Sequence, residues 1–272
     1  MLKKILNKFL NKSKKRQEVQ AEPEKILYQS SNRLEGKNVI IIGGGKGIGK
    51  AIANRFANEG AKILINSRSK TDLENVKKEI ENNNGECSYF EGDITDTKTI
   101  HNLFLESKSK LGKLDILINC AGTVDFGSIE NFPLSKFEKI MDLNVKSVFS
   151  CIQEAIKIMR SNGDEGKIIT IGSIASKWTG RGGDGSYSAS KYAVYGMIES
   201  IARQLHGSGS NIAVGLICPG VVDTTLTNPG KDKKPNWMRP STIADSVLHM
   251  VTAPKNVNIF DLTIFGMDEK PW

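Results

Sequence analysis

The sequence predicts a single α/β domain in which a parallel sheet of about seven strands carries helices on both faces. Short apolar runs rich in β-branched residues alternate along the chain with longer stretches of helical pattern. The first run is followed at once by a glycine cluster and then by a helix. A chain of 272 residues with 39% hydrophobic content can bury one large core, so no second domain is needed.

The expected strands are the seven apolar runs, taken here in chain order. They are residues 38–42, 62–66, 87–91, 116–119, 167–171, 212–217 and 259–264. The first is expected to enter a tight turn at residues 43–49, and a helix that Gly60 closes is expected to follow. Helices are expected between the later strands as well, which gives right-handed crossovers and a parallel sheet.

The glycine cluster predicts a phosphate-binding turn. At a strand–turn–helix junction the backbone bends sharply and approaches a ligand closely, which glycine allows. The free N–H groups at the helix start then attract an anion such as a pyrophosphate. The glycines are spaced Gly43-x-x-x-Gly47-x-Gly49, so they do not form the regular GxGxxG fingerprint.

Tyr187 and Lys191 are four residues apart, which places both side chains on one face of a helix. An ammonium group beside a phenol favours the phenolate, so such a tyrosine can act as an acid and a base. An ordinary helix pair is the alternative interpretation, and this motif alone does not separate the two.

Several further motifs follow in a fixed order, and together they resemble the compact branch of the short-chain dehydrogenase/reductase family. After the glycines come Asp93 in EGDITD, NCAG at 119–122, Asn144 in MDLNVKS, Ser173 in TIGSIAS, Tyr187 with Lys191, and CPGVVDT at 218–224. The resemblance covers the chain from about Gly36 onward. It implies a Rossmann-type doubly wound sheet, with residues 36–272 forming one NAD(P)-binding catalytic domain.

The resemblance also implies the catalytic residues. Tyr187 would be the general acid in carbonyl reduction, or the base in alcohol oxidation. Lys191 would favour the phenolate and bond the nicotinamide ribose, Ser173 would orient the substrate oxygen, and Asn144 would hold a water in a proton relay. A strand-end hydroxyl for Ser173 and a turn or capping residue for Asn144 are the alternatives.

The resemblance implies a cofactor site as well. Asp93 would bond the adenine amine, Ile94 would pack on the ring, Asn119 would brace the central strands, Thr224 would close over the pyrophosphate, and the backbone near Val222 would meet the carboxamide. The full set is Gly43, Gly45, Lys46, Gly47, Ile48, Gly49, Ser67, Arg68, Asp93, Ile94, Asn119, Ala121, Gly122, Tyr187, Lys191, Pro219, Gly220, Val222 and Thr224.

The end of the second strand predicts NADP(H) as the cofactor. A site for NAD usually places a carboxylate there, on the ribose 2′-hydroxyl. Here the strand ends in Ser67 and Arg68, and Lys46 lies in the glycine turn. Two cations and a hydroxyl suit a dianionic 2′-phosphate. Solvated surface charges are the alternative interpretation.

Three positions depart from the family pattern. Ile42 stands where a threonine is common before the first glycine, and Cys120 stands where an asparagine is usual. The spacing from Ser173 to Tyr187 is about one residue longer than expected. None of these departures changes the four proposed proton-handling residues.

The positive charge is concentrated at the N-terminus. The whole chain carries +8; residues 1–35 contain nine Lys/Arg and four Asp/Glu, which leaves 29 against 26 for residues 36–272. A nearly balanced body argues against a nucleic-acid substrate. Residues 1–35 are expected to be a basic amphipathic extension, and residues 1–16 either contact an anionic membrane surface or form a tail or a helix packed on a neighbouring subunit.

The remaining features predict a cytoplasmic enzyme without a metal. The four cysteines have no metal-ligand spacing and lie in or beside apolar segments, as expected of reduced thiols, and the three histidines are scattered.

We expect a homodimer or homotetramer. The substrate would be a small carbonyl compound or alcohol, and Arg181, Lys231, Lys233, Lys234 and Arg239 favour an acidic one unless they are solvated. A non-catalytic dinucleotide sensor or scaffold tethered by its N-terminal helix is the alternative function, and an epimerase or dehydratase of the extended branch is a third.

Overall fold

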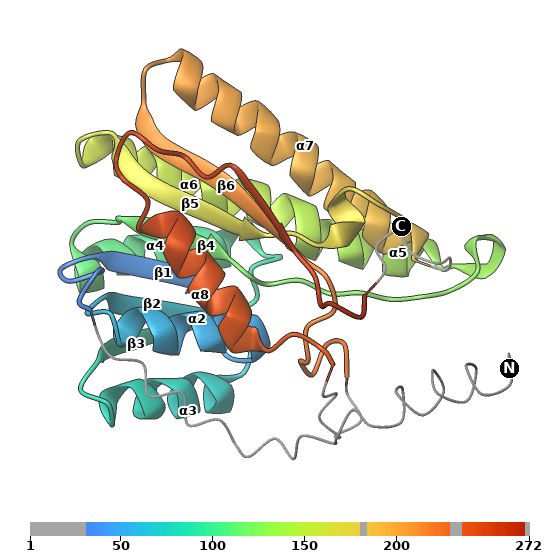
Figure 1. The fold of residues 1–272 in the computed structure, drawn as a ribbon, viewed down its shortest axis with the longest axis horizontal. Helices are drawn as coiled ribbons and strands as arrows, with labels where there is room; N and C mark the ends of the chain where they lie inside the picture. Colours follow the sequence, from blue (N-terminus) through green and yellow to red (C-terminus); the bar gives the residue numbers. More distant parts are fainter. Residues whose placement is uncertain (1–30, 180–183, 229–235, 270–272) are drawn as a thin grey trace, which may run out of the picture.

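The computed structural model describes residues 31–179, 184–228 and 236–269, and these form a layered α/β domain (Figure 1). Its sheet contains seven parallel strands in the order β3-β2-β1-β4-β5-β6-β7. The strands are β1 Asn38–Ile42, β2 Lys62–Ser67, β3 Glu86–Glu91, β4 Ile116–Asn119, β5 Glu165–Ile171, β6 Asn211–Pro219 and β7 Asp261–Ile264. The predicted fold class is therefore confirmed, and each predicted strand is present.

The last strand begins two residues later than the sequence predicted. Its ladder starts where Asp261 pairs with Leu216. Just before it, the side-chain amide of Asn258 donates to the carbonyl oxygen of Val214 at 3.0 Å. Because the Asn258 side chain occupies the Val214 carbonyl, the backbone of residues 259–260 cannot use this acceptor, and the regular strand begins only at Asp261.

Alternate residues of each central strand enter two separate cores, one on each face of the sheet. Val39 and Ile41 pack in one core with α2 Gly47–Ala57, α3 Lys70–Glu81 and α8 Pro240–Val251. Ile40 and Ile42 pack in the other with α4 Thr97–Leu111, α6 Ser147–Ser161 and α7 Gly185–Gly207. All five residues of β1 are buried, because both of its faces are covered.

The shorter elements lie between β4 and α7. They are η1 Ile129–Asn131, α5 Leu134–Met141, the π-helical turn η2 Asp142–Lys146, and η3 Ile174–Ser176. The π turn continues directly into α6, so α5, η2 and α6 form one run of helix. Single π turns inside helices are frequent at functional sites, and this one contains Asn144.

The strand order reverses between β1 and β4, which lie side by side although β2 and β3 come between them in the chain. In a doubly wound sheet, ligands bind at the carboxyl ends of the strands beside such a reversal. The glycine turn, β4 and β5 all end there, so the fold brings the predicted motifs to one edge.

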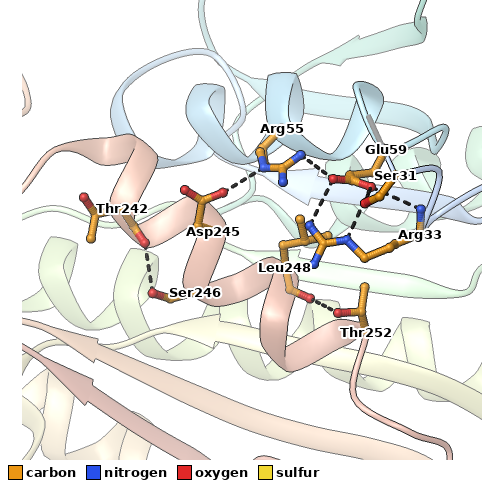
Figure 2. A network of polar contacts seen from close by, with 9 residues as sticks. All are labelled: Ser31, Arg33, Arg55, Glu59, Thr242, Asp245, Ser246, Leu248 and Thr252. Carbon is orange, nitrogen blue, oxygen red and sulfur yellow. Dashed lines mark hydrogen bonds and ion pairs between the residues drawn. The ribbon is translucent and has the colours of Figure 1, made fainter. Parts of the chain in front are cut away.

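Residues 31–35, which we assigned to the extension, contact the domain. Leu34 is buried, and Arg33 forms an ion pair with Glu59 at the end of α2 at 3.0 Å (Figure 2). The amphipathic segment 1–16 lies outside the described residues, as do Arg181, Lys231, Lys233 and Lys234. No helix in the described part of the chain is both long and apolar enough to cross a membrane.

Candidate functional site

The glycine turn between β1 and α2 is closed so tightly that its positions need glycine. Gly43 has φ +80°, and a Cβ there would lie 2.6 Å from the backbone nitrogen of Ala121. A Cβ on Gly49 would lie 2.1 Å from the carbonyl oxygen of Gly43. These distances are impossible for a side chain, so strand, turn and helix meet backbone to backbone.

The start of α2 offers backbone donors at this turn. In the described helix the N-cap residue, Lys46, forms no side-chain cap, and the first turn contains no acidic residue. The first N–H groups of a helix lack partners within the helix and carry its positive dipole end. The turn can therefore bind an anion.

A cavity of about 560 Å³ runs along the carboxyl edge of the sheet from this turn. Most of the predicted cofactor residues line it: Gly43, Gly45, Lys46, Gly47, Ile48, Ser67, Arg68, Asp93, Ile94, Ala121, Gly122, Tyr187, Lys191, Pro219, Gly220, Val222 and Thr224. Gly49 and Asn119 are buried behind its wall. Asn119 braces two strands, since its Nδ2 donates to Oγ1 of Thr170 on β5 at 3.4 Å.

The lining also includes residues that sequence reasoning missed: Asn66, Ser69, Asp72, Gly92, Cys120, Thr123, Leu143, Ile171, Gly172, Thr225, Leu226 and Thr227. Most of them are immediate neighbours of predicted residues at strand ends. Asp72 is different, because it comes from the first turn of α3. The sequence signal for Asp72 is the spacing Ser69-x-x-Asp72, which is typical of a helix start. In the structure Ser69 Oγ accepts a hydrogen bond from the Asp72 N–H at 3.3 Å.

Both predicted cations at the β2 end of the cavity are paired with carboxylates. Lys46 lies 2.9 Å from Asp72, and Arg68 lies 3.7 Å from Asp93. Burial alone would raise the pKa of the Asp72 carboxyl, but hydrogen bonds from Ser69 and Lys46 outweigh it and lower the pKa. Both acids are therefore ionised at neutral pH, and they orient the two cations on the cavity wall.

Tyr187 and Lys191 line the other end of the cavity, side by side on α7. The Lys191 Nζ is 5.6 Å from the centre of the Tyr187 ring. The same Nζ donates to the carbonyl oxygen of Ile171, at the end of β5, at 3.0 Å. This bond fixes a nearly buried ammonium between the tyrosine and the sheet edge.

Asn144 lies behind the cavity wall rather than in its lining. Its Oδ1 accepts from the Thr123 N–H at 2.9 Å, and its Nδ2 donates to the Thr123 carbonyl at 2.9 Å and to Ser190 Oγ at 3.0 Å. A Cβ on Gly122 would be 3.4 Å from Asn144 Oδ1 and 3.9 Å from Lys191 Nζ, so both groups approach one point. In this structure the amide of Asn144 holds the strand β4 exit against α7.

Ser173 is also outside the lining, although Gly172 before it is part of the wall. Its hydroxyl oxygen caps η3 by accepting from the Ala175 N–H at 3.1 Å. In the other direction, the Ser173 N–H donates to Ser176 Oγ. The strand-end alternative for Ser173 thus has a structural basis. Part of the longer spacing to Tyr187, residues 180–183, lies outside the described residues.

The segment after β6 closes back on itself at its base. Val222 pairs with Met238 in an isolated β-bridge, and Asp223 forms an ion pair with Arg239 at 2.7 Å. We considered Arg239 as a site for an acidic substrate, but its guanidinium holds the base of this segment. Thr224 lies close to Gly47, with its methyl 3.3 Å from a Cβ placed on that glycine.

Cys120 lines the cavity where the family pattern has an amide. Burial raises the pKa of its thiol to about 12, although Lys191 and the Gly49 N–H oppose the shift. Burial also raises the pKa of the Cys87 and Cys151 thiols to about 12 and of Cys218 to about 11. These thiols are protonated at neutral pH, and within the described ranges no three His, Cys, Asp or Glu side chains are grouped as a metal site.

Comparison with known proteins is consistent with this geometry. The model of the short chain dehydrogenase family matches residues 37–235. An uncharacterized oxidoreductase of Staphylococcus aureus (strain USA300) is 31% identical over 234 residues, which are 85% of this chain and 97% of the relative.

Two solved structures show the same arrangement. A dehydrogenase/reductase from Sinorhizobium meliloti 1021 superposes with a TM-score of 0.79 at 32% identity, covering 87% of this chain and 96% of its own. A short chain dehydrogenase from Burkholderia cenocepacia J2315, solved in complex with NADP, has a TM-score of 0.77 at 28% identity, with coverages of 86% and 98%. The chain is therefore an oxidoreductase of the short-chain dehydrogenase/reductase family.

Proposed function

We propose that this protein is an NADP(H)-dependent oxidoreductase that moves a hydride between the nicotinamide and a carbonyl or secondary alcohol substrate. One observation carries the proposal. A single cavity joins the glycine turn, which suits a pyrophosphate, to the Tyr187 and Lys191 pair, which suits proton transfer. A nucleotide held at the first end has its reactive ring available at the second.

The residues present fit a dinucleotide. The cradle at Gly43 and Gly49 is one that a Cβ would fill, and the first N–H groups of α2, which no side-chain cap occupies, would bind the pyrophosphate. Ile94 offers an apolar surface for the adenine, and Asp93 offers an acceptor for its amine. When bound, the cofactor supplies the hydride; the protein supplies binding, orientation and the proton.

The choice of NADP(H) over NAD(H) rests on Lys46 and Arg68, two cations on the same part of the cavity wall. The NADP complex of the Burkholderia cenocepacia relative supports it by similarity. Asp72 and Asp93 would keep the cations in place in the free protein, and a 2′-phosphate would then share them.

An Arg68→Ala variant tests this cofactor choice. The Arg68 side chain is 75% exposed, so its removal leaves the fold intact, but a phosphate would lose a charge-assisted bond worth about 1.5–3 kcal/mol. We expect kcat/KM for NADPH to fall about tenfold or more, while the value for NADH stays within about twofold. Arg203→Ala, which removes an exposed arginine on α7 from its pair with Glu199, is the control. A wild-type enzyme that prefers NADH would contradict the choice.

In the proposed reaction, Tyr187 transfers the proton to or from the substrate oxygen. Lys191, whose ammonium lies beside the ring and is held by the Ile171 carbonyl, stabilises the phenolate that forms when the proton leaves. Ser173 would donate its hydroxyl proton to the substrate oxygen, because the bond that its oxygen accepts from the Ala175 N–H leaves this proton free. Asn144 would link Lys191 to solvent through a water.

Tyr187→Phe is the decisive variant. It removes only the phenolic oxygen, so we expect an unchanged Kd for NADPH by fluorescence titration and a turnover that falls by about 10²–10⁴. Turnover is followed as NADPH oxidation over keto acids, ketoacyl thioesters, quinones and cyclic ketones. Tyr89→Phe, which removes a hydroxyl that donates to Glu74 on α3, is the matched control.

The same measurement separates enzyme from sensor. Full turnover by Tyr187→Phe would remove the assigned role of the tyrosine. Tight binding of NADPH without oxidation by any of these substrates would instead favour the non-catalytic dinucleotide sensor.

A further inference from the structure

The chain returns to the cofactor cavity at its C-terminal end. After β7, a turn at residues 266–269 closes with a bond from the Glu269 N–H to the Gly266 carbonyl at 2.9 Å. The turn places the Glu269 carboxylate at the end of β6, where both of its oxygens lie 3.1 Å from the Val221 nitrogen. Its Oε2 also accepts from the Gly266 N–H at 3.3 Å.

This carboxylate lies directly behind the cavity wall. A Cβ on Gly220 would be 2.1 Å from Glu269 Oε2, so only a glycine leaves room for it, and Gly220 itself lines the cavity. The Gly220 N–H donates to the Ile264 carbonyl at 2.7 Å, which ties this part of the wall to β7. Only Gly220 therefore separates the Glu269 carboxylate from the cavity at this point of the wall.

The strand order shows which end of the cavity this charge faces. The cations Lys46 and Arg68 lie at the β1 and β2 side, whereas β6 neighbours β5 on the far side of β4. The Gly172 N–H bonds the Ile217 carbonyl of β6, and the carbonyl of the preceding residue, Ile171, holds Lys191. Glu269 is therefore on the side of Tyr187 and Lys191, away from the end that would hold the adenosine.

We propose that Glu269 is a positioning residue for the nicotinamide end of the cofactor site, and that its charge favours the oxidised cofactor over the reduced one. The inference rests on the proposed function. The oxidised ring carries a positive charge and the reduced ring carries none, while the rest of the dinucleotide is the same in both forms. A carboxylate behind the wall attracts only the charged ring, and the reduced cofactor bound here becomes a stronger hydride donor.

Separate dissociation constants for the oxidised and reduced cofactor test this proposal without any turnover. They are measured by calorimetry or fluorescence for the wild type and for Glu269→Gln and Glu269→Ala. The Gln side chain keeps an oxygen that accepts from the Val221 N–H, so we expect the Kd of NADPH to change less than about twofold. The Kd of NADP⁺ should rise about three- to tenfold, because one charge near the ring is lost.

The alanine variant removes the acceptor as well as the charge. We expect it to weaken both cofactor forms, and to weaken NADP⁺ more. Glu165→Gln, which makes the same change of charge at the start of β5 on the opposite edge of the sheet, should alter neither constant. Thermal melting of each variant verifies the fold.

The outcomes are distinct from those that test the function. An equal change of both constants in Glu269→Gln, or no change in either, overturns the charge effect. Wild-type protein that binds neither oxidised nor reduced dinucleotide, with or without the 2′-phosphate, overturns the proposed function itself. Measuring NAD⁺ and NADH alongside keeps the test valid if the preference between the two cofactors is reversed.

Discussion

At Gly49 the first turn of α2 passes so close to Gly43 that no side chain fits between the two residues. Backbone flexibility is not the reason for glycine here, because only Gly43 and Gly47 in this turn have positive φ. The requirement is space: the helix start must touch the strand exit if its N–H groups are to face the cavity. A methyl group would push the helix away from the anion site.

Gly49→Ala should therefore damage cofactor binding more than overall structure. We expect the Kd of NADPH to rise at least about tenfold, because the donors at the helix start move, and the melting temperature to fall by several degrees. Gly196→Ala is the matched control, since Gly196 is an exposed position of α7 with nothing within 4 Å of a new Cβ. It should gain about 0.5–1 kcal/mol of stability and bind NADPH as the wild type does. Wild-type affinity in Gly49→Ala would show that the turn tolerates the displacement.

At the scale of elements, an ionic cluster centred on the buried side chains of Arg55 and Glu59 joins α2, α8 and the segment before β1 (Figure 2). Glu59 is fully buried at the end of α2 and accepts from Arg55 at 2.5 Å, Arg33 at 3.0 Å and Ser31 at 2.8 Å. Arg55 also bonds Asp245 of α8 at 2.7 Å. Glu59 thus holds the segment before β1 against α2, and Arg55 extends the cluster to α8.

The cluster predicts a pH dependence of stability. Burial alone raises the pKa of the Glu59 carboxyl, but hydrogen bonds from Arg33, Ser31 and Arg55 outweigh it and lower the pKa from 4.5 to about 2. Because the folded pKa is depressed, this stabilisation is complete above pH 4.5 and is lost as the pH falls towards 2. It amounts to about 3 kcal/mol at neutral pH.

Glu59→Gln removes this contribution. Urea unfolding at pH 7 should show a loss of about 2–4 kcal/mol, and the difference from wild type should shrink as the pH is lowered from 5 to 2.5. Glu106→Gln, which breaks an exposed pair with Lys110, should cost less than about 1 kcal/mol. A difference between wild type and Glu59→Gln that stays constant with pH would contradict the depressed pKa.

The sequence predicted the strands well, but it did not predict the contacts that hold the site residues in place, and the reason is physical. Strands covered on both faces, such as β1, are continuous apolar runs, and glycine at a forced turn is visible in the letters themselves. The ion pair of Lys46 with Asp72 joins two helices, and the bond of Asn144 to Thr123 joins a π turn to a strand exit. Such contacts depend on how elements pack, and single residues do not encode them.

For the whole molecule, we propose association of two or more copies through α4 and α6. These neighbouring helices expose Leu105, at 57%, and Phe149, at 45%, although apolar side chains of this size are usually covered. A second copy of the same chain would bury them. The expected membrane contact of residues 1–16 lies outside the described residues and stays a prediction.

Sedimentation velocity tests the association. The wild type should sediment as a dimer or tetramer, and the double variant Leu105→Lys and Phe149→Lys should shift towards the monomer, because two charges cannot be buried in an apolar contact. Val257→Lys, at another exposed apolar position, should keep the wild-type mass. A monomeric wild type at tens of micromolar would rule out the proposed interface.

The bridge of Val222 to Met238 and the ion pair of Asp223 to Arg239 have a consequence for how this enzyme's selectivity can be altered. These two contacts bring residues 222–223 and 238–239 together, so the segment between them leaves the domain and returns to it at one place. Residues 228–237 can then be exchanged for those of a relative, while Thr224 and the residues up to Thr227, which line the cofactor cavity, are kept together with the sheet and the proton-transfer pair. Selectivity in such a chimaera would follow the grafted piece.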